Sequence, residues 1–190
     1  EWATVSTDAA TILAYGAIGS LVEDPAFPGT HDGTVVTGSI LKLAGAGLFD
    51  DIPDLDAVAD LDSYGGIVSS GTYGFSAGLD LSAATGSIRL SGHVRAIVSN
   101  ILEFIDDRTA PIDEWEDFDG NTAPGAADAW IEARYSPTNP AGTPEWTEWM
   151  RLDVDVFNPG WFEFRGQLRS HDPAYNILVS ELRIYAEELA

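Results

Sequence analysis

The sequence predicts an all-β protein: an antiparallel β-sandwich of eight or nine strands with long acidic loops. Residues 161–168 and 178–184 both alternate apolar with polar side chains, and the turn-forming sequence His171-Asp172-Pro173 lies between them. This two-residue period is typical of strands with one buried face. Glycine is frequent, with 19 residues, and separates short runs rich in β-branched, aromatic and leucine residues. We therefore expect a sandwich or jelly roll whose sheets each have one solvent-facing side.

The expected strands follow from these runs in order along the chain. Ile and Leu at 12–17, Val, Ile and Leu at 35–43, and Tyr and Phe at 71–79 mark the first three. The strand expected at 87–98 alternates Ile88, Leu90, Val94 and Ala96 with Arg89, Ser91, His93 and Arg95. The remaining expected strands are 129–135, 149–156, 161–169 and 177–187, with shorter pieces at 2–5 and 100–105. The side chains expected to face the core near the carboxyl terminus are Phe162, Phe164, Leu168, Leu178, Leu182 and Ile184.

A chain of 190 residues is long enough for one domain of sandwich size. We expect residues 66–190 to form the jelly roll, and residues 1–65 to supply N-terminal strands and an acidic loop, as part of the same domain or as a short lead-in. The regular pattern is interrupted at 50–62, 106–128 and 136–144, and such loops are where a sandwich keeps its binding chemistry. The first residues, Glu1-Trp2, suggest a processed product or a piece of a longer polypeptide.

Acidic residues dominate the charge balance. The 31 Asp and Glu residues against 9 Lys and Arg give a formal net charge of −22. Binding of nucleic acid is excluded, because a phosphate backbone needs cationic neutralisation, and an anionic membrane surface is disfavoured for the same reason. No apolar run reaches the ~20 residues of a membrane span, so no membrane insertion is expected. Self-repulsion of this size favours a saline, marine setting, the alternative being that acidity keeps the protein soluble.

The sequence contains no assembled catalytic motif. His31, His93 and His171 are isolated, and there is neither a zinc-type His pair nor a nucleophile elbow nor a phosphate-binding glycine loop. We therefore expect no enzymatic activity, although 31 acidic residues leave the carboxylate pair of a glycosidase open.

Calcium is the cofactor that the residue types favour most, since hard oxygen ligands are abundant. Asp117, Asp119 and Asn121 place three oxygen-bearing side chains at alternate positions, and Asp128 follows at the spacing of the bidentate acid of an EF-hand. The glycine comes too early for that motif, and the flanks do not resemble helices. The alternative is a solvated acidic turn.

Three tryptophans in or beside the expected loops, Trp115, Trp146 and Trp149, are candidate platforms for sugar rings. Core packing is the commoner fate of tryptophan. Trp146 and Trp149 are three residues apart at the entrance to an expected strand, so both cannot face the same side of a regular sheet. We expect one of them to be exposed.

The order of landmarks along residues 66–186 resembles the C-terminal regions of phage tail-tip host-specificity proteins, the central-fibre components of long-tailed phages. The residues that carry the resemblance are Ser70-Gly71-Thr72-Tyr73, Leu79-Asp80-Leu81, Ile88-Arg89-Leu90, 104–108 with 112–120, 130–136, 143–149, 162–165 and 176–182. The tyrosine and the Leu-Asp-Leu tripeptide also look like galactose-binding jelly rolls of the discoidin type. Both resemblances imply a jelly-roll sandwich.

The tail-tip resemblance implies a non-enzymatic structural and host-recognition component of a phage virion, located outside cells. Its implied partners are other tail-tip proteins, two further copies in a homotrimer, and a host-surface glycan or receptor bound multivalently. The alternatives are a carbohydrate-binding module of a hydrolase secreted by a marine bacterium, and an architectural sandwich without a ligand.

Overall fold

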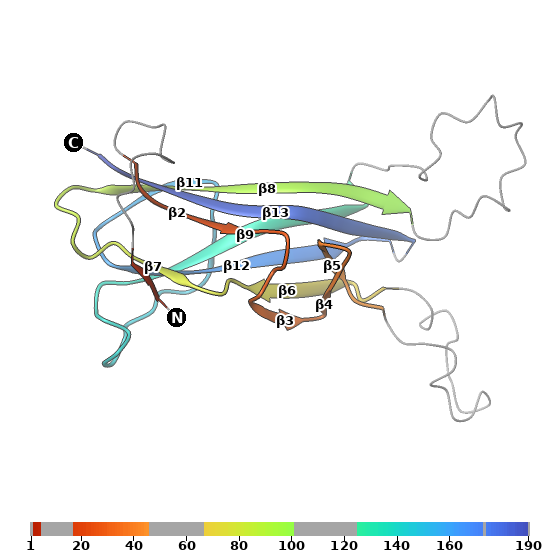
Figure 1. Cartoon of the computed structure of the whole chain (residues 1–190), viewed down its shortest axis with the longest axis horizontal. Coiled ribbons are helices and arrows are strands. Elements are labelled where there is room, and N and C mark those ends of the chain that lie inside the picture. Colours follow the sequence, from red (N-terminus) through yellow and green to blue (C-terminus); the bar gives the residue numbers. More distant parts are fainter. Residues whose placement is uncertain (1, 5–16, 46–66, 101–124, 173, 190) are drawn as a thin grey trace, which may run out of the picture.

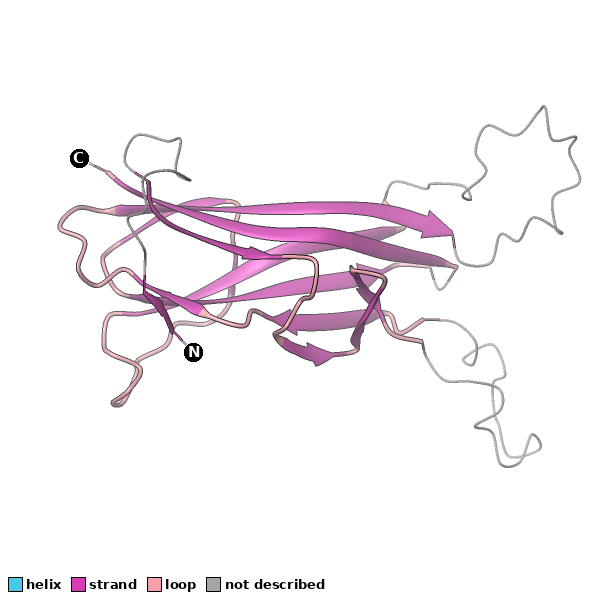
Figure 2. Cartoon of the chain, viewed as in Figure 1, coloured by secondary structure: helices cyan, strands magenta, loops and turns pink. Residues whose placement is uncertain are grey.

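The computed structural model describes residues 2–4, 17–45, 67–100, 125–172 and 174–189, and these form two β-sheets packed face to face (Figures 1 and 2). Thirteen strands and no helix occur in this part of the chain. The all-β sandwich predicted from the sequence is therefore confirmed, whereas its jelly-roll topology stays a prediction. Within these residues no helix exists that could span a membrane.

The seven-stranded sheet is built around β12. Its strands are β1 (Trp2–Thr4), β3 (Thr30–Asp32), β6 (Ser70–Gly74), β7 (Gly78–Asp80), β9 (Ala127–Ser136), β10 (Met150–Arg151) and β12 (Trp161–Ser170). Strand β12 pairs along its whole length with β9 on one side, and with β7 and then β6 on the other. All pairs are antiparallel except β1 with β7.

The six-stranded sheet is built around β13, which lies with β8 along the top of Figure 1. Its strands are β2 (Ala17–Glu23), β4 (Thr34–Thr37), β5 (Ile40–Leu43), β8 (Ile88–Asn100), β11 (Val154–Phe157) and β13 (Tyr175–Glu188). Strand β13 pairs with β8 over nearly all its residues and with β2 and β5 on the other side. Residues 17–45 thus supply strands to both sheets.

The core lies between the two sheets and contains the side chains that the alternation predicts. Phe162, Phe164 and Leu168 of β12 and Leu182 and Ile184 of β13 are all buried. The prediction is wrong for Leu178, which is only half-buried, while its neighbour Val179 is fully buried. A β-bulge between Val179 and Glu181 is the reason, because an extra residue in a strand reverses which side the preceding side chains face.

The described residues form more than the expected eight or nine strands, partly because three expected strands each divide in two. The strand expected at 35–43 becomes the hairpin of β4 and β5, whose two-residue turn has Gly38 at φ 56° and Ser39 at φ 68°. Two successive positive φ values define the turn type that matches the twist of a hairpin. The strands expected at 71–79 and 149–156 become β6 with β7 and β10 with β11.

The sequence does not predict β2 or the three-residue strand β3 at their observed positions. The strand predicted at 12–17 lies outside the described residues except for Ala17, where β2 begins. The short piece at 100–105 is described only at Asn100, the last residue of β8. The acidic loops at 50–62 and 106–124 also lie outside the described residues.

A buried carboxylate ties the N-terminal strands to the seven-stranded sheet. Glu23 at the end of β2 is only 3% exposed, and its oxygens accept hydrogen bonds from the Tyr73 hydroxyl at 2.7 Å and from the Ser76 N–H and hydroxyl at 2.8 and 2.7 Å. The Tyr73 hydroxyl in turn accepts a hydrogen bond from the Gly29 N–H at 2.9 Å. The four residues fix the chain entering β3 against β6 and β7.

Candidate functional site

The outer face of the seven-stranded sheet gathers four tryptophan side chains that are not part of the core. The four tryptophans whose side chains are described are Trp130, Trp146, Trp149 and Trp161, and all are half-buried. Trp161 and Trp130 occupy outward positions of β12 and β9, and the other two lie in the segment that leads into β10. None belongs to the buried core. We call this face the tryptophan face.

Guanidinium groups lie over the indole rings of the tryptophan face. The Arg134 guanidinium carbon is 4.8 Å from the ring centroid of Trp146 and 4.7 Å from that of Trp149, and Arg165 lies 4.5 Å from Trp149. Arg151 lies 5.6 Å from the ring of Trp130. Cations at this range are attracted by the ring quadrupole and hold the indoles in place.

Each of the two central arginines is also paired with a carboxylate on the neighbouring strand. Arg134 of β9 donates its Nε–H to Glu163 of β12 at 2.6 Å, and Arg165 of β12 donates its Nε–H to Glu132 of β9 at 2.7 Å. The register places each pair directly opposite, which is the geometry in which cross-strand ion pairs form. The centre of the face is therefore neutral and rigidly hydrogen-bonded.

Glu132 is the most strongly engaged acid on this face. Its carboxylate accepts hydrogen bonds from the Trp130 Nε1–H at 3.0 Å, from Arg165, and from the Gln167 amide at 3.4 Å. Burial alone would raise the pKa of this carboxyl, but the hydrogen bonds from Trp130 and Arg165 and the charge of Arg165 outweigh burial, so its pKa lies below the ordinary value. Glu132 is thus held ionised and joins Trp130 to β12.

Replacement of Glu132 by glutamine is expected to lower the free energy of unfolding at pH 7 by about 1 kcal/mol, since hydrogen bonds to a charged, partly exposed group are lost. Because the pKa of Glu132 is lower in the folded state, its ionised carboxylate stabilises the protein at pH values above the unfolded-state pKa of about 4.3. This stabilisation is lost as the pH falls through the folded-state pKa. The difference between wild type and E132Q should therefore shrink below about pH 4. Urea unfolding at several pH values measures it, with the exposed Glu148→Gln as the control. Equal values for both variants would contradict the role given to Glu132.

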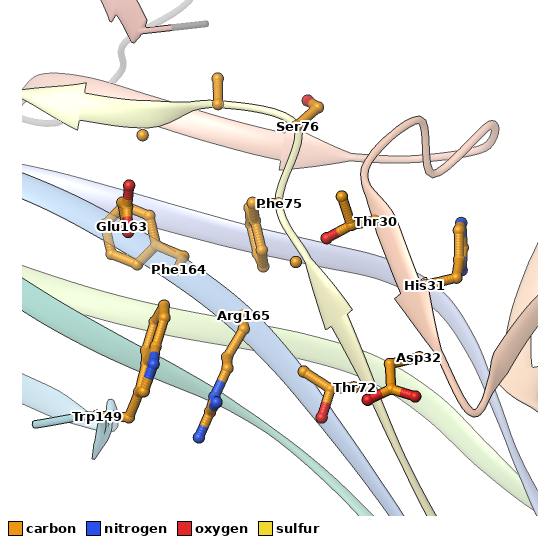
Figure 3. A pocket seen from close by; sticks show the side chains of 13 residues that line it. Thr30, His31, Asp32, Thr72, Phe75, Ser76, Trp149, Glu163, Phe164 and Arg165 are labelled. Carbon is orange, nitrogen blue, oxygen red and sulfur yellow. The ribbon is translucent and has the colours of Figure 1, made fainter.

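A cleft of about 460 Å³ opens beside the arginines, between β12, the β6–β7 connection and β3 (Figure 3). Trp149 and Arg165 stand side by side at one end, and Phe75 and Ser76 form the opposite wall. The lining also includes the polar side chains of Thr30, Asp32, Thr72 and Glu163. The cleft thus combines aromatic surface with exposed hydroxyl, carboxylate and guanidinium groups.

The buried carboxylate described above supports one wall of this cleft. Ser76 lines the cleft, and its backbone and hydroxyl are both held by Glu23. Phe75 packs with its ring centroid 6.0 Å from Tyr73 and 5.9 Å from Phe164. Because Tyr73 and Phe164 are core residues, the wall is continuous with the core and is pre-formed.

The structure brings two of the predicted binding residues together. Trp146 and Trp149 lie in an irregular segment before β10 rather than in a regular strand, both are half-buried, and both contact Arg134, so the expected exposure of one of them is not found. Trp115 lies outside the described residues. Sequence reasoning missed Trp130, Arg134 and Asp32 as members of the face. The alternation of Trp130, Glu132 and Arg134 along β9 was the available signal for the first two.

Of the four predicted calcium ligands, only Asp128 lies within the residues that the structure describes. Asp117, Asp119 and Asn121 lie outside the described residues, and Asp128 of β9 is hydrogen-bonded at 3.0 Å to His171 Nε2. No group of three or more His, Cys, Asp or Glu side chains suited to a metal occurs in the described part of the chain.

The histidines are engaged in local contacts. Both ring nitrogens of His31 have partners, the Thr34 hydroxyl at 3.0 Å and the Phe27 carbonyl at 3.2 Å, and the ring of His93 lies edge-on to Tyr185 with centroids 6.1 Å apart.

Comparison with protein-family models, with curated proteins and with solved structures finds no match for this chain.

Proposed function

We propose that this chain is a non-enzymatic β-sandwich that binds glycan through the tryptophan face, and that it does so as a host-recognition component of a phage tail tip. The observation that supports glycan binding most is the placement of every described tryptophan side chain on one outer sheet face beside a polar cleft. Tryptophan is costly to leave half-exposed and is most often packed in a core, so a cluster of this kind indicates a surface kept for a ligand.

The chemistry of the cleft suits a sugar. A pyranose ring offers C–H groups on its faces and hydroxyl groups around its edge. Phe75 and Trp149 supply apolar surface for the former, and the Asp32 carboxylate and the Arg165 guanidinium supply an acceptor and donors for the latter. Pre-formed walls reduce the entropy lost on binding.

The tail-tip setting rests on the sequence resemblance and supplies the mechanism. Several copies around a tail axis raise the effective concentration of each site, so that a weak single-site affinity becomes useful avidity. A jelly-roll topology of the galactose-binding type, a trimeric state and contacts with other tail-tip proteins belong to this proposal. The tryptophan face would then be directed towards the host surface.

A carbohydrate-binding module of a secreted hydrolase is the second candidate, and the same cleft supports it because the described residues form the site within one chain. The two settings differ in assembly. Native mass spectrometry of the full chain should give a trimer for the tail-tip component and a monomer for the module. A glycan array separates both from an architectural sandwich, which would bind nothing.

Replacement of Trp149 by alanine is expected to weaken glycan binding at least about tenfold, because one aromatic contact and one cation–π partner of Arg165 are removed. Wild type is first screened on a glycan array, and the affinity for each hit is then measured by isothermal titration calorimetry. Asp32→Asn is the second variant, since Asp32 is exposed and its replacement leaves the packing intact.

Tyr185→Ala is the matched control, because Tyr185 is a partly exposed aromatic residue on the six-stranded sheet. Its affinity for the same glycans should equal that of wild type. Absence of binding to any glycan by wild type would contradict the proposed function, and equal losses in Trp149→Ala and Tyr185→Ala would exclude the cleft as the site.

A further inference from the structure

A second hollow of about 500 Å³ lies on the tryptophan face and is not used by the site described so far. Its lining includes Ser70 of β6, Trp130 of β9 and the β12 residues Gln167 and Arg169, together with His171. Like the first cleft, it has a tryptophan at one side and hydrogen-bonding side chains around it. The two hollows therefore have the same kind of lining.

The strand register makes the two hollows neighbours. Arg165 of the first cleft lies opposite Gly74, Gln167 lies opposite Thr72, and Arg169 of the second hollow lies opposite Ser70. Successive outward residues of β12 thus run from one hollow into the other. The Thr72 hydroxyl, in the lining of the first, donates a hydrogen bond to Gln167 Oε1, in the lining of the second, at 3.1 Å.

The distance spanned is larger than one sugar ring. Arg165 and Arg169 are four residues apart on an extended strand, which corresponds to about 13 Å. A single monosaccharide in the first cleft would leave Trp130 and the second hollow unoccupied. A ligand that contacts both must be an extended chain lying along β12.

The charges on the face favour a neutral chain. Arg134 and Arg165 are paired with Glu163 and Glu132, and His171 is hydrogen-bonded to Asp128, which also lies opposite Arg169 in the register. Arg151 likewise lies 3.6 Å from Asp153, so among the described arginines of this face the exposed Arg169 alone has no ion pair with a described residue, and the net charge of −22 on the whole chain repels anions.

We propose that the two hollows are adjacent subsites for one neutral, linear oligosaccharide that lies along β12, with Trp149 and Trp130 at its two ends. This inference rests on the proposed glycan-binding function and adds the class of glycan. It assigns Trp130, Gln167 and Arg169 to recognition of the units beyond the first.

The test uses homo-oligosaccharides of one to six units from the cello-, manno- and chito-oligosaccharide series, with alginate oligosaccharides of the same lengths as acidic probes. Calorimetry on the full chain gives the affinity for each length. For the neutral series that binds, we expect the hexasaccharide to bind wild type at least about tenfold more tightly than the single sugar, because further contacts are made without a second loss of translational freedom. The alginate series should bind more weakly at every length.

Two variants test which residues cause the increase in affinity with oligosaccharide length. Trp130→Ala and Arg169→Ala should both reduce the ratio of hexasaccharide to monosaccharide affinity towards one. Arg169 is exposed, so its replacement tests the subsite even if Trp130→Ala perturbs the sheet. Arg95→Ala, which removes an exposed arginine from the outer face of β8, is the control and should keep the wild-type ratio.

The outcomes separate this inference from the proposed function. An affinity that does not increase with chain length, a ratio unchanged in both variants, or equally tight binding of alginate would overturn the two-subsite inference while leaving glycan binding intact. Failure of wild type to bind any glycan, on the array or in these series, would overturn the proposed function itself.

Discussion

Replacement of Phe162 by alanine is expected to lower the free energy of unfolding by about 3–5 kcal/mol, the usual range for removing a large aromatic side chain from a packed core. Phe162 is 0% exposed and lies on β12, at the centre of the seven-stranded sheet. Its ring centroid is 5.2 Å from that of Tyr135 in β9 and 5.3 Å from that of Phe157 in β11. Because β9 and β11 belong to different sheets, the ring joins the two layers.

Chemical denaturation with urea, followed by tryptophan fluorescence, measures this loss. Ile97→Ala serves as the control, since Ile97 is 64% exposed on β8 and its truncation should change the stability by no more than about 0.5 kcal/mol. A loss below about 1 kcal/mol for Phe162→Ala would contradict the packing of the two sheets around this ring.

Replacement of Tyr73 by phenylalanine is expected to cost about 2–3 kcal/mol, although it removes a single oxygen atom. The Tyr73 hydroxyl donates to the buried Glu23 carboxylate and accepts from the Gly29 N–H, so its loss leaves a buried charge and a backbone donor without that partner. Among the described residues, the remaining donors to Glu23 are the N–H and hydroxyl of Ser76, and both are uncharged. The Tyr73 hydroxyl thus links β6 to the end of β2 and supports the carboxylate that holds Ser76 in the cleft wall.

The pH dependence of the same variant identifies the mechanism. Burial, with the hydrogen bond to Glu23 and its negative charge, raises the pKa of Tyr73 well above its ordinary value. A raised pKa in the folded state stabilises the protein below the unfolded-state pKa of about 10, and this stabilisation is lost as the pH rises further. The difference between wild type and Tyr73→Phe should therefore be constant below about pH 9 and narrow above about pH 10.

Tyr185→Phe is the control for both measurements. Tyr185 is partly exposed, and its hydroxyl accepts a hydrogen bond from Arg183 at 2.9 Å on the surface of the six-stranded sheet. The variant should be destabilised by less than about 1 kcal/mol. If Tyr73→Phe behaved in the same way, the buried network would not stabilise the fold.

Alternation of apolar and polar residues was sufficient to predict most of the core. Phe162, Phe164, Leu182 and Ile184 all lie where the two-residue period places them. The period failed at Leu178 because a β-bulge changes the register without leaving a mark such as glycine or proline in the sequence. Local patterns record which side a residue faces only as long as the pairing of the strand is regular.

The candidate site was less accessible to sequence reasoning. Trp146 and Trp149 could be singled out by their place near loops, but their joint contact with Arg134 depends on an irregular segment crossing the sheet surface. Asp32 and Phe75 meet at the cleft only because β3 pairs with β6, a contact between segments some 40 residues apart. Short-range patterns carry no information on such pairings.

The strands supplied by residues 17–45 have a consequence for any attempt to shorten the chain. Within β5, Leu41 and Leu43 are buried, and the Leu43 N–H and carbonyl are both bound by the side-chain amide of Asn176, each at 3.1 Å. A fragment beginning at residue 66 would uncover this apolar surface, leave the Asn176 amide unsatisfied in the interior, and open the flanks of β6 and β13 to solvent. Exposed strand edges with unpaired N–H and C=O groups pair with strands of other molecules. Such a fragment should therefore precipitate rather than fold.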